Sequence, residues 1–305
     1  MFFNKLKVCI SLKLIKKLLL MEKSKFTNKT LWSKTIEPKT NPFDLHLTEL
    51  WGYRDLLFLF VRRDFVAFYK QTILGPIWFF IQPIFTMLVY IFLFGNIASL
   101  STDGLPQPLF YLIGIISWSY YSESLTKTAS VFKDNASIFG KVYFPRLIMP
   151  ISIVISSLIK LFVQSILFFL LFLYFNTSIP NFFTFILLTP LLIVIMALQA
   201  LGLGMLISAL TTKYRDLALL LTFAIQILMY TTTVVYPLSS LSGYMYTIVR
   251  LNPLTAVIEG LRLIILGKGS LEIFDIIYAI TSTILLVVIG AFVFNKAEKK
   301  FIDTI

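Results

Sequence analysis

Long apolar segments recur along this chain of 305 residues, and they limit the folds that are open to it. The hydrocarbon core of a bilayer is about 30 Å thick, which a helix of about 20 apolar residues crosses. Hydrophobic residues make up 58% of the sequence, and because a soluble domain contains roughly 45–50%, the excess is expected to face lipid. The sequence therefore predicts an all-α integral membrane protein, with a six-span domain over 73–294. The six predicted transmembrane helices are 76–97, 109–131, 147–173, 183–209, 217–236 and 273–294.

A seventh apolar region, 237–272, lies before the last predicted span and is repeatedly interrupted. Its interruptions leave pieces too short to cross a bilayer, so we expect short re-entrant or interfacial helices. The interrupting residues are Pro237, Gly243, Pro253, Gly260 and Gly267. Glu259 and Arg262 are three residues apart in one piece, so their side chains can pair, and we interpret this pair as structural.

The uneven distribution of basic residues predicts the orientation in the membrane, because cytoplasmic segments are enriched in Lys and Arg. Residues 1–72 carry 14 such residues, whereas the predicted loops 98–108 and 176–182 carry none. The other basic connectors and the tail contain Lys127, Lys133, Lys141, Arg146, Lys213, Arg215, Lys296, Lys299 and Lys300. Both termini, including a tail over 295–305, are therefore predicted to be cytoplasmic. This distribution explains the net charge of +12 without a nucleic-acid partner.

The part of the chain before the first span contains three predicted segments. Residues 1–43 form a basic extension and linker, in which Met21 is an alternative start. Residues 44–72 place apolar side chains at helical spacing among charged ones, which is typical of an amphipathic helix lying in the membrane surface. Gly75 and Pro76 then form a structural turn, because glycine can end one helix and proline suits the first turn of the next.

Composition and motifs exclude several chemistries. Cys9 and His46 are the only cysteine and histidine, so one chain can build neither a disulfide nor a metal site from Cys and His ligands. The sequence has no G-x-x-x-x-G-K-[ST] motif, since "GKGS" at 267–270 lacks the leading glycine at the required spacing. We therefore expect no ATPase site, no enzymatic activity, no metal site and no cofactor bound by this chain.

Two charged residues lie within predicted spans, where charge is costly and is often functional. Lys160 is near the middle of the third span, and Glu123 in the second span is a candidate partner. Both are candidates for a substrate path, and a purely structural ion pair is the alternative. Trp78 and Tyr121 are further path candidates because flat aromatic rings stack on sugars. The alternative for these two is a position at the membrane interface or against lipid.

The connector "NASIFGKVYFPRLIMP" (135–150) is basic, aromatic and rich in proline. Pro145 disfavours helical backbone at Phe144, so a short helix is expected over 136–143. Tyr143 and Phe144 would then form an apolar tip that fits the groove of a partner.

A second connector, "TTKYRDL" (211–217), follows the fourth predicted span. Its Arg215 and Asp216 either hold the helix ends, contact a partner or are simply solvated. Within the span before it, small residues recur every four positions at Ala200, Gly204 and Ser208. Such a stripe allows helices to approach closely, and we interpret it as a packing device.

Three classes of function remain open from the residues alone. A secondary transporter or flippase would use Lys160 and Glu123 in ion coupling, yet the two halves of the chain show no convincing repeat. A membrane-embedded lipid or glycan enzyme would need a constellation of acid, base or metal ligands, for which the spans offer little support. A membrane subunit moved by another protein needs a firm cytoplasmic surface, which the connector 135–150 supplies.

Four segments, in order, resemble the six-span permease subunit of ABC exporters for polysaccharides and polyol phosphates, the group that exports O-antigen, capsule and teichoic acid. "LWGYRDLLFLFVRRDFVAFYKQTILGPIW", with Gln82 and Pro83, is similar to the family's surface helix, turn and first span. "NASIFGKVYFPRLIMP" and "TTKYRDL" are similar to its two cytoplasmic connectors, and "LNPLTAVIEGLR" to its outer re-entrant region. The resemblance covers about 45–270. Lys160 departs from it, because an acidic residue is expected more often there.

The resemblance implies a type-2 ABC exporter in the bacterial plasma membrane. It would be a homodimer of this chain with two separate ATPase subunits, which bind ATP and Mg, and it would move a lipid-linked polysaccharide or teichoic acid polymer outward. Arg62, Arg63 and Lys70 would attract the pyrophosphate of the lipid head group, with ordinary positive-inside charge as the alternative. The residues implied to contact the ATPase subunits are Lys141, Tyr143, Phe144, Pro145, Arg146, Arg215 and Asp216.

Overall fold

The computed structural model describes residues 47–70, 74–139, 141–142, 144–214 and 216–302, and every regular element among them is helical, which confirms the all-α prediction. The chain divides into two compact units, Met1–Asp44 and Leu45–Ile305, and the predicted extension 1–43 lies outside the described residues. The helices are α2 (Leu47–Gly52), α3 (Arg54–Tyr69), α4 (Trp78–Tyr90), α5 (Gln107–Ala129), α6 (Val131–Asp134), α7 (Ala136–Phe139), α8 (Ile148–Tyr174), α9 (Phe182–Lys213), α10 (Leu217–Tyr230), α11 (Gly243–Arg250), α12 (Pro253–Leu266) and α13 (Ile273–Ile302). A π-helical stretch, Ile91–Ile97, extends α4.

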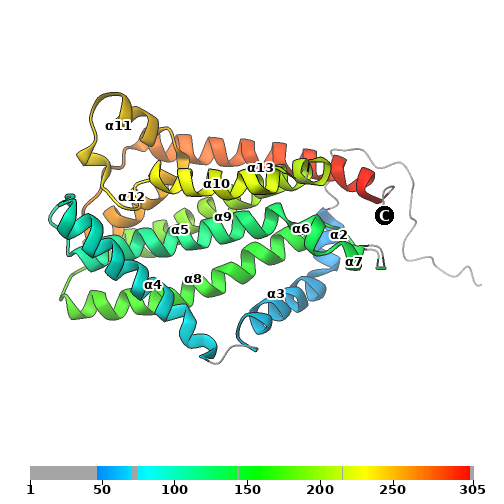
Figure 1. Cartoon of the computed structure of the whole chain (residues 1–305), viewed down its shortest axis with the longest axis horizontal. Coiled ribbons are helices and arrows are strands. Elements are labelled where there is room, and N and C mark those ends of the chain that lie inside the picture. Colours follow the sequence, from blue (N-terminus) through cyan, green and yellow to red (C-terminus); the bar gives the residue numbers. More distant parts are fainter. Residues whose placement is uncertain (1–46, 71–73, 140, 143, 215, 303–305) are drawn as a thin grey trace, which may run out of the picture. The chain divides into compact units, whose positions relative to one another are not determined.

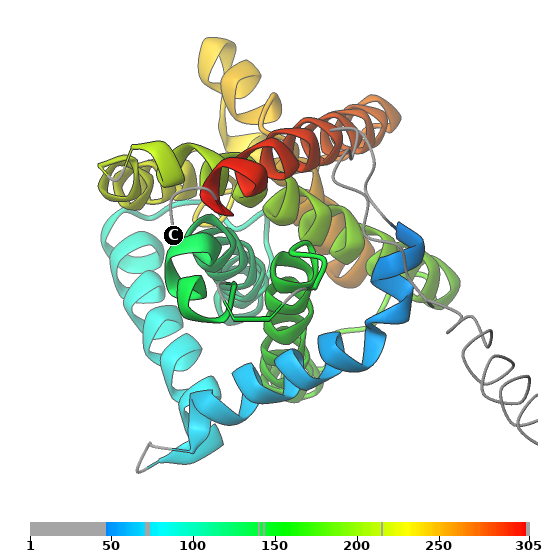
Figure 2. The ribbon, with the colours of Figure 1, turned by 90° about the vertical axis from the view of Figure 1, so that its right-hand side faces the viewer.

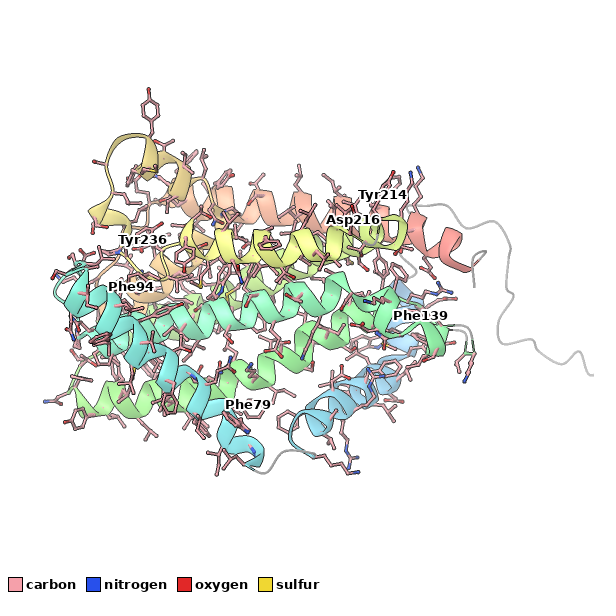
Figure 3. All side chains as sticks on the ribbon, in the orientation of Figure 1. Phe79, Phe94, Phe139, Tyr214, Asp216 and Tyr236 are labelled. Atoms are coloured by element: carbon pink, nitrogen blue, oxygen red, sulfur yellow. The ribbon has the colours of Figure 1, made fainter. Side chains whose placement is uncertain are left out.

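The long helices α4, α5, α8, α9, α10 and α13 run side by side between two ends of the second unit (Figure 1). Short helices α6 and α7 and the last turns of α13 lie at one end, together with Phe139, Tyr214 and Asp216 (Figure 3). Helices α11 and α12 lie at the other end (Figure 1), together with Phe94 and Tyr236 (Figure 3). The connectors that the charge pattern predicts to be cytoplasmic therefore share one end of the bundle.

Among the residues that the structure describes, four segments are long and apolar enough to cross a membrane. They are Gly75–Ile97, Ile148–Tyr174, Phe182–Lys213 and Ile273–Glu298, which correspond to the first, third, fourth and sixth predicted spans. The second predicted span corresponds to α5, which occupies the centre of the end view, enclosed by α4, α8, α9 and α10 (Figure 2). Of its 23 residues, 16 are buried. Because its neighbours shield it, α5 can carry serine, threonine and tyrosine along its length.

The fifth predicted span, 217–236, is wrong as a continuous helix. Helix α10 ends at Tyr230 after 14 residues, which is about 21 Å and shorter than the hydrocarbon core. The chain then turns, and the side-chain amide of Asn252 donates hydrogen bonds to the Thr231 carbonyl and the Thr232 hydroxyl. The Tyr236 hydroxyl donates to the Tyr230 carbonyl at 2.6 Å. The carbonyl groups of Tyr230 and Thr231 therefore accept hydrogen bonds from side chains, in place of the backbone N–H groups that would bond them if α10 continued.

Small residues bring three of the helices into close contact. A Cβ added to Gly290 of α13 would lie 2.2 Å from the carbonyl oxygen of Gly202 on α9. A Cβ added to Gly204 would lie 2.6 Å from Thr128 Cβ on α5. Residues Ala200, Gly204 and Ser208 of the predicted stripe are all buried, so its interpretation as a packing device is confirmed. The crossing of Gly202 and Gly290 was not predicted.

The predicted surface helix 44–72 consists of two helices, α2 and α3, that meet at Tyr53. Helix α3 packs along α8 before the chain turns into α4. In this turn Gly75 has a φ of +54°, which favours glycine, and Pro76 stands in the first turn of the 3-10 helix Gly75–Ile77. Gly75 therefore begins the next helix, whereas α3 already ends at Tyr69.

The interrupted region 237–272 forms the short helices α11 and α12, as predicted. Gly267 ends α12 in the left-handed conformation, with a φ of +75°. Eleven of the 14 residues of α12 are buried. Arg250, the last residue of α11, forms ion pairs with Glu272 and Asp275, which connect α11 to the start of α13.

Candidate functional site

A charged cluster connects α5 to α8. The Glu123 carboxylate lies between two ammonium groups, with Oε2 2.7 Å from Lys160 Nζ and Oε1 2.7 Å from Lys127 Nζ. Glu123 and Lys160 are largely buried, whereas Lys127 is 45% exposed. The predicted partnership of Lys160 and Glu123 is thus confirmed. Lys127 is an additional member, which its position four residues after Glu123 could have indicated.

This cluster lines a small recess beneath α3. The recess measures about 20 Å³, which is room for about one water molecule. Its walls come from α3, α4, α5 and α8, and they are Asp64, Phe65, Phe79, Glu123, Lys127, Ser156, Ser157 and Lys160. Phe65 and Phe79 stack with ring centroids 6.3 Å apart, which joins α3 to the start of α4.

A larger polar cleft of about 230 Å³ lies between α4, α5 and α8. Its lining residues are Gln82, Pro83, Thr86, Tyr90, Ile115, Trp118, Ser119, Ser122, Gln164 and Val234. The lining combines hydroxyl, amide and aromatic groups on otherwise apolar helices. This cleft was not predicted from the sequence, although the polar pairs Gln82/Thr86 and Ser119/Ser122, at spacings of four and three, could have indicated it.

Trp78 and Tyr121, the aromatic candidates for a substrate path, lie elsewhere. The Trp78 ring is 45% exposed at the start of α4. Tyr121 is buried in the core, with its ring centroid 6.0 Å from that of Trp118. Neither is among the residues that line the cleft. Tyr121 therefore contacts a residue of the cleft, Trp118, without lining the cleft itself.

The connector between α7 and α8 is held against the bundle by a buried side chain. Phe144 is only 4% exposed, and its ring centroid lies 5.7 Å from that of Phe60 and 5.8 Å from that of Phe139. The expected exposed tip at Phe144 is therefore wrong, because the ring completes an apolar cluster under α3. The expected helix 136–143 is also too long, since α7 ends at Phe139.

Arg146 anchors the same connector. Its Nε lies 3.6 Å from Glu298 Oε1 of α13, and its guanidinium stands 5.0 Å from the centroid of the Phe139 ring. The side chain is largely buried, and its burial lowers the pKa of the guanidinium. Lys141 and Val142 are the exposed residues here, Pro145 is partly exposed, and Tyr143 lies outside the described residues.

The second connector reaches the same end of the bundle. Tyr214 and Asp216 are exposed there, beside the region of Phe139 (Figure 3). The Lys213 ammonium lies 4.9 Å from the centroid of the Tyr214 ring. Arg215 lies outside the described residues. The two connectors thus lie at the same end of the bundle, and we call their exposed residues Lys141, Val142, Tyr214 and Asp216 together the connector surface.

The three basic residues implied to contact a lipid head group lie along one groove of α3. This groove has a volume of about 590 Å³ and is lined by Leu59, Arg62, Arg63, Val66, Ala67 and Lys70. Arg63 also pairs with Asp64, with NH2 2.7 Å from Oδ1. The groove combines three cations with apolar side chains. We call it the α3 groove.

The Glu259–Arg262 pair is a structural centre, as interpreted from the sequence. Both side chains are about 1% exposed, and Oε1 of Glu259 lies 3.1 Å from NH1 of Arg262. Glu259 also accepts hydrogen bonds from the backbone N–H groups of Leu238 and Ser270. Arg262 donates to the Val234 carbonyl and stands 3.7 Å from the centroid of the Phe110 ring. Within the described residues no group of three His, Cys, Asp or Glu side chains could hold a metal ion.

Comparison with known proteins gives the class to which this bundle belongs. Residues 55–266, more than half of the chain, match the ABC-2 type transporter family, and the chain therefore belongs to this family. It is 26% identical over 260 residues to an O-antigen export system permease protein of Myxococcus xanthus, covering 84% of this chain and 98% of the relative. It is 26% identical over 250 residues to the protein of that name from Klebsiella pneumoniae, covering 82% and 94%. A polysialic acid transport protein of Escherichia coli is 23% identical over 254 residues, covering 81% and 94%.

Proposed function

We propose that this chain is the permease subunit of an ATP-driven exporter that moves a lipid-linked polysaccharide or teichoic acid polymer outward across the bacterial plasma membrane. The observation that carries the proposal is the match to the ABC-2 type transporter family over residues 55–266. Relatives named for O-antigen export and polysialic acid transport support a glycan as substrate. Family membership favours this function over a secondary transporter that couples ions through Lys160 and Glu123, and over a membrane-embedded enzyme.

The working unit that we propose is a homodimer of this chain with two ATPase subunits, which supply the ATP and Mg site. The helices α4, α5, α8, α9, α10 and α13 would be its six spans, with both termini cytoplasmic and α3 in the membrane surface. The basic connectors at one end of the bundle support this orientation. Helix α10 is short for a span, and the turn 231–236 would complete the crossing inside the protein, where irregular backbone is tolerated.

In this proposal the substrate meets the α3 groove first. Arg62, Arg63 and Lys70 would hold the anionic head group at the membrane surface, while Leu59 and Val66 contact the lipid chain. The polar cleft between α4, α5 and α8 would then line the glycan path, with Trp118 and Tyr90 as stacking surfaces. The charge cluster of Glu123 and Lys160 lies on α5 and α8, in a recess whose walls also include residues of α3 and α4.

The connector surface is the proposed contact with the ATPase subunits. Lys141 and Asp216 are exposed and would touch the partner directly. Phe144 and Arg146 would act by positioning, since they hold the connector against α3, α7 and α13. Force on the connector would thus pass into the bundle through packed side chains. Tyr143 and Arg215 are proposed contacts as well.

The experiment that tests the proposed function combines two measurements. Affinity-tagged chain, purified from its own host in mild detergent, is expected to bring down an ATPase subunit in a ratio of about one to one. Deletion of the gene is expected to abolish a surface glycan or teichoic acid, and the intracellular lipid-linked polymer should accumulate. Transport by the purified chain alone, under an ion gradient and without ATP, would contradict the proposal.

Charge reversal on the connector surface is expected to uncouple the exporter. Lys141→Glu should lower co-purification of the ATPase subunit and export about tenfold, because like charges placed across an interface repel. Folding should be unchanged, since the side chain is exposed. The matched control is Lys268→Glu, which makes the same charge change on an exposed residue in the loop after α12. Equal losses in the two variants would rule out a specific contact at Lys141.

A further inference from the structure

Helix α11 turns an apolar side away from the bundle. Tyr244 is 90% exposed, and Met245, Ile248 and Leu251, the residue after the helix, are each more than half exposed. Residues three and four apart are neighbours on a helix, so 244, 248 and 251 form one face, and Met245 borders it. A contiguous exposed apolar patch marks a contact with a membrane or with another protein. We call these four residues the α11 face.

Arg250 fixes the orientation of α11. Its Nε donates a hydrogen bond to Asp275 Oδ1 at 2.6 Å, and its NH2 lies 2.5 Å from Glu272 Oε2. Its NH1 also donates to the Tyr246 hydroxyl at 3.3 Å. Val249, on the same side of the helix, is buried. These contacts hold one side of α11 against the protein, and the opposite side, the α11 face, therefore points outward.

The ion pairs of Arg250 also give the depth of α11. The segment Ile273–Glu298 is long and apolar enough to cross a membrane, and the two acidic partners of Arg250 lie at its beginning. A span that crosses the hydrocarbon core begins at the membrane surface. Helix α11 lies beside the first turns of α13 (Figure 1), and in the end view it projects, in gold, beyond the other helices (Figure 2). This places α11 level with the membrane surface.

The first turns of α13 continue the apolar surface. Ile273, Phe274 and Ile277 are each more than half exposed. The Arg250 guanidinium stands 5.9 Å from the centroid of the Phe274 ring, so the end of α11 is next to this exposed part of α13. Apolar side chains that a spanning helix leaves uncovered contact lipid. The lipid beside α13 thus reaches α11, and tyrosine, such as Tyr244, is favoured at the level of the head groups.

We propose that the α11 face docks on the lipid surface at the end of the bundle opposite the connector surface. Its four side chains insert among the head groups and the first carbons of the acyl chains, as in other interfacial helices. This inference rests on the membrane-spanning arrangement proposed above. Because Arg250 connects α11 to α13, the docked helix fixes the start of the last span relative to the bilayer.

The experiment places a fluorescent reporter on the α11 face. Cys9 is the only cysteine, so the variant Cys9→Ser/Met245→Cys, labelled with a nitrobenzoxadiazole fluorophore, reports from one position. The full chain is reconstituted in nanodiscs of phosphatidylcholine that carries a nitroxide on the head group or deep in the acyl chain. We expect the head-group nitroxide to quench the reporter most. The acyl-chain nitroxide and aqueous iodide should each quench it about threefold less.

Other orders of quenching would overturn the docking. Strongest quenching by the acyl-chain nitroxide would mean that α11 is re-entrant, and strongest quenching by iodide would leave the face in water. Weak quenching by all three would mean that protein covers the face. In that case a disulfide between two chains through unlabelled Met245→Cys would identify a second copy as the cover.

Two adjacent substitutions provide a matched control. Ile248→Glu places a carboxylate in the α11 face and should lower head-group quenching of the reporter about threefold, because a charge resists leaving water. Thr247→Glu makes the same charge change at an exposed polar position beside the face and should leave the quenching nearly unchanged. Both side chains are exposed, so both variants should fold, which their melting temperatures check. Equal losses would contradict insertion of the apolar face.

Failure of the exporter function is read separately, from ATPase co-purification and surface glycan. The quenching measurement needs neither ATP nor polymer. A lipid-docked α11 in a chain that exports nothing would refute only the exporter function. Export by a chain whose α11 face stays in water would refute only the docking.

Discussion

Glu259→Leu is expected to destabilise the protein by about 3–5 kcal/mol, because it leaves the Arg262 guanidinium buried without its counter-ion. Arg262 is about 1% exposed and cannot reach solvent without unfolding α12. The substitution also removes the acceptor for the backbone N–H groups of Leu238 and Ser270. Helix α12, the turn before α11 and the turn after α12 therefore lose a common anchor. The loss is measured by thermal or denaturant unfolding in detergent micelles.

The double variant Glu259→Leu/Arg262→Met is the decisive control. It removes the buried Arg262 charge together with its partner Glu259. Buried ion pairs can often be replaced by apolar residues at little cost in stability. We expect it to lie within about 2 kcal/mol of the wild type, and hence to be more stable than the single variant. Glu259→Gln, which keeps one oxygen acceptor, should fall between them. A double variant as unstable as Glu259→Leu would mean that packing, and not charge compensation, stabilises the region around α12.

Gly290→Val is also expected to destabilise the protein strongly, with a loss of about 3 kcal/mol or more through overpacking. The first added carbon would lie 2.2 Å from the Gly202 carbonyl oxygen, and the obstacle is backbone, which cannot rotate away. Helices α9 and α13 would have to separate along their whole contact. The free energy of unfolding and the yield of folded protein measure the effect, and export should fall with them.

Gly52→Ala is the matched control for this prediction. Gly52 ends α2, and a Cβ there would meet nothing within 4 Å. Because glycine costs a helix roughly 0.5–1 kcal/mol relative to alanine, the control should be neutral or slightly stabilising. If Gly290→Val proved as mild as Gly52→Ala, the close crossing of α9 and α13 would be wrong.

The features that the sequence predicted correctly are those that depend on neighbouring residues in the chain. The long apolar runs 76–97, 147–173, 183–209 and 273–294 recur as helices or helical segments, since twenty apolar residues suffice to specify each. The proline and glycine positions in 237–272 predicted its short helices for the same reason. The prediction of one helix over 217–236 was wrong, because the side chain of Asn252, the residue before α12, binds the turn that ends α10.

Contacts between helices were harder to predict from the sequence, because they depend on how each helix is rotated and on residues distant in the chain. Glu123 and Lys160 could be proposed as partners, and the i,i+4 spacing from Glu123 could have added Lys127, but Ser157 joins the recess only through the packing of α5 against α8. The cleft around Trp118 needs three helices to come together. The sequence pattern therefore indicated the chemistry of the site without its shape.

Hydropathy and the positions of basic residues were enough to establish a helical membrane protein and to group its basic connectors, because both properties are read from consecutive residues. Tertiary packing alone established which connector side chains point inward. Arg146 is buried through its contact with Glu298, 152 residues later in the chain, and Phe144 through Phe60. No local pattern distinguishes such an anchor from an exposed docking residue, since burial depends on the distant helix that covers it.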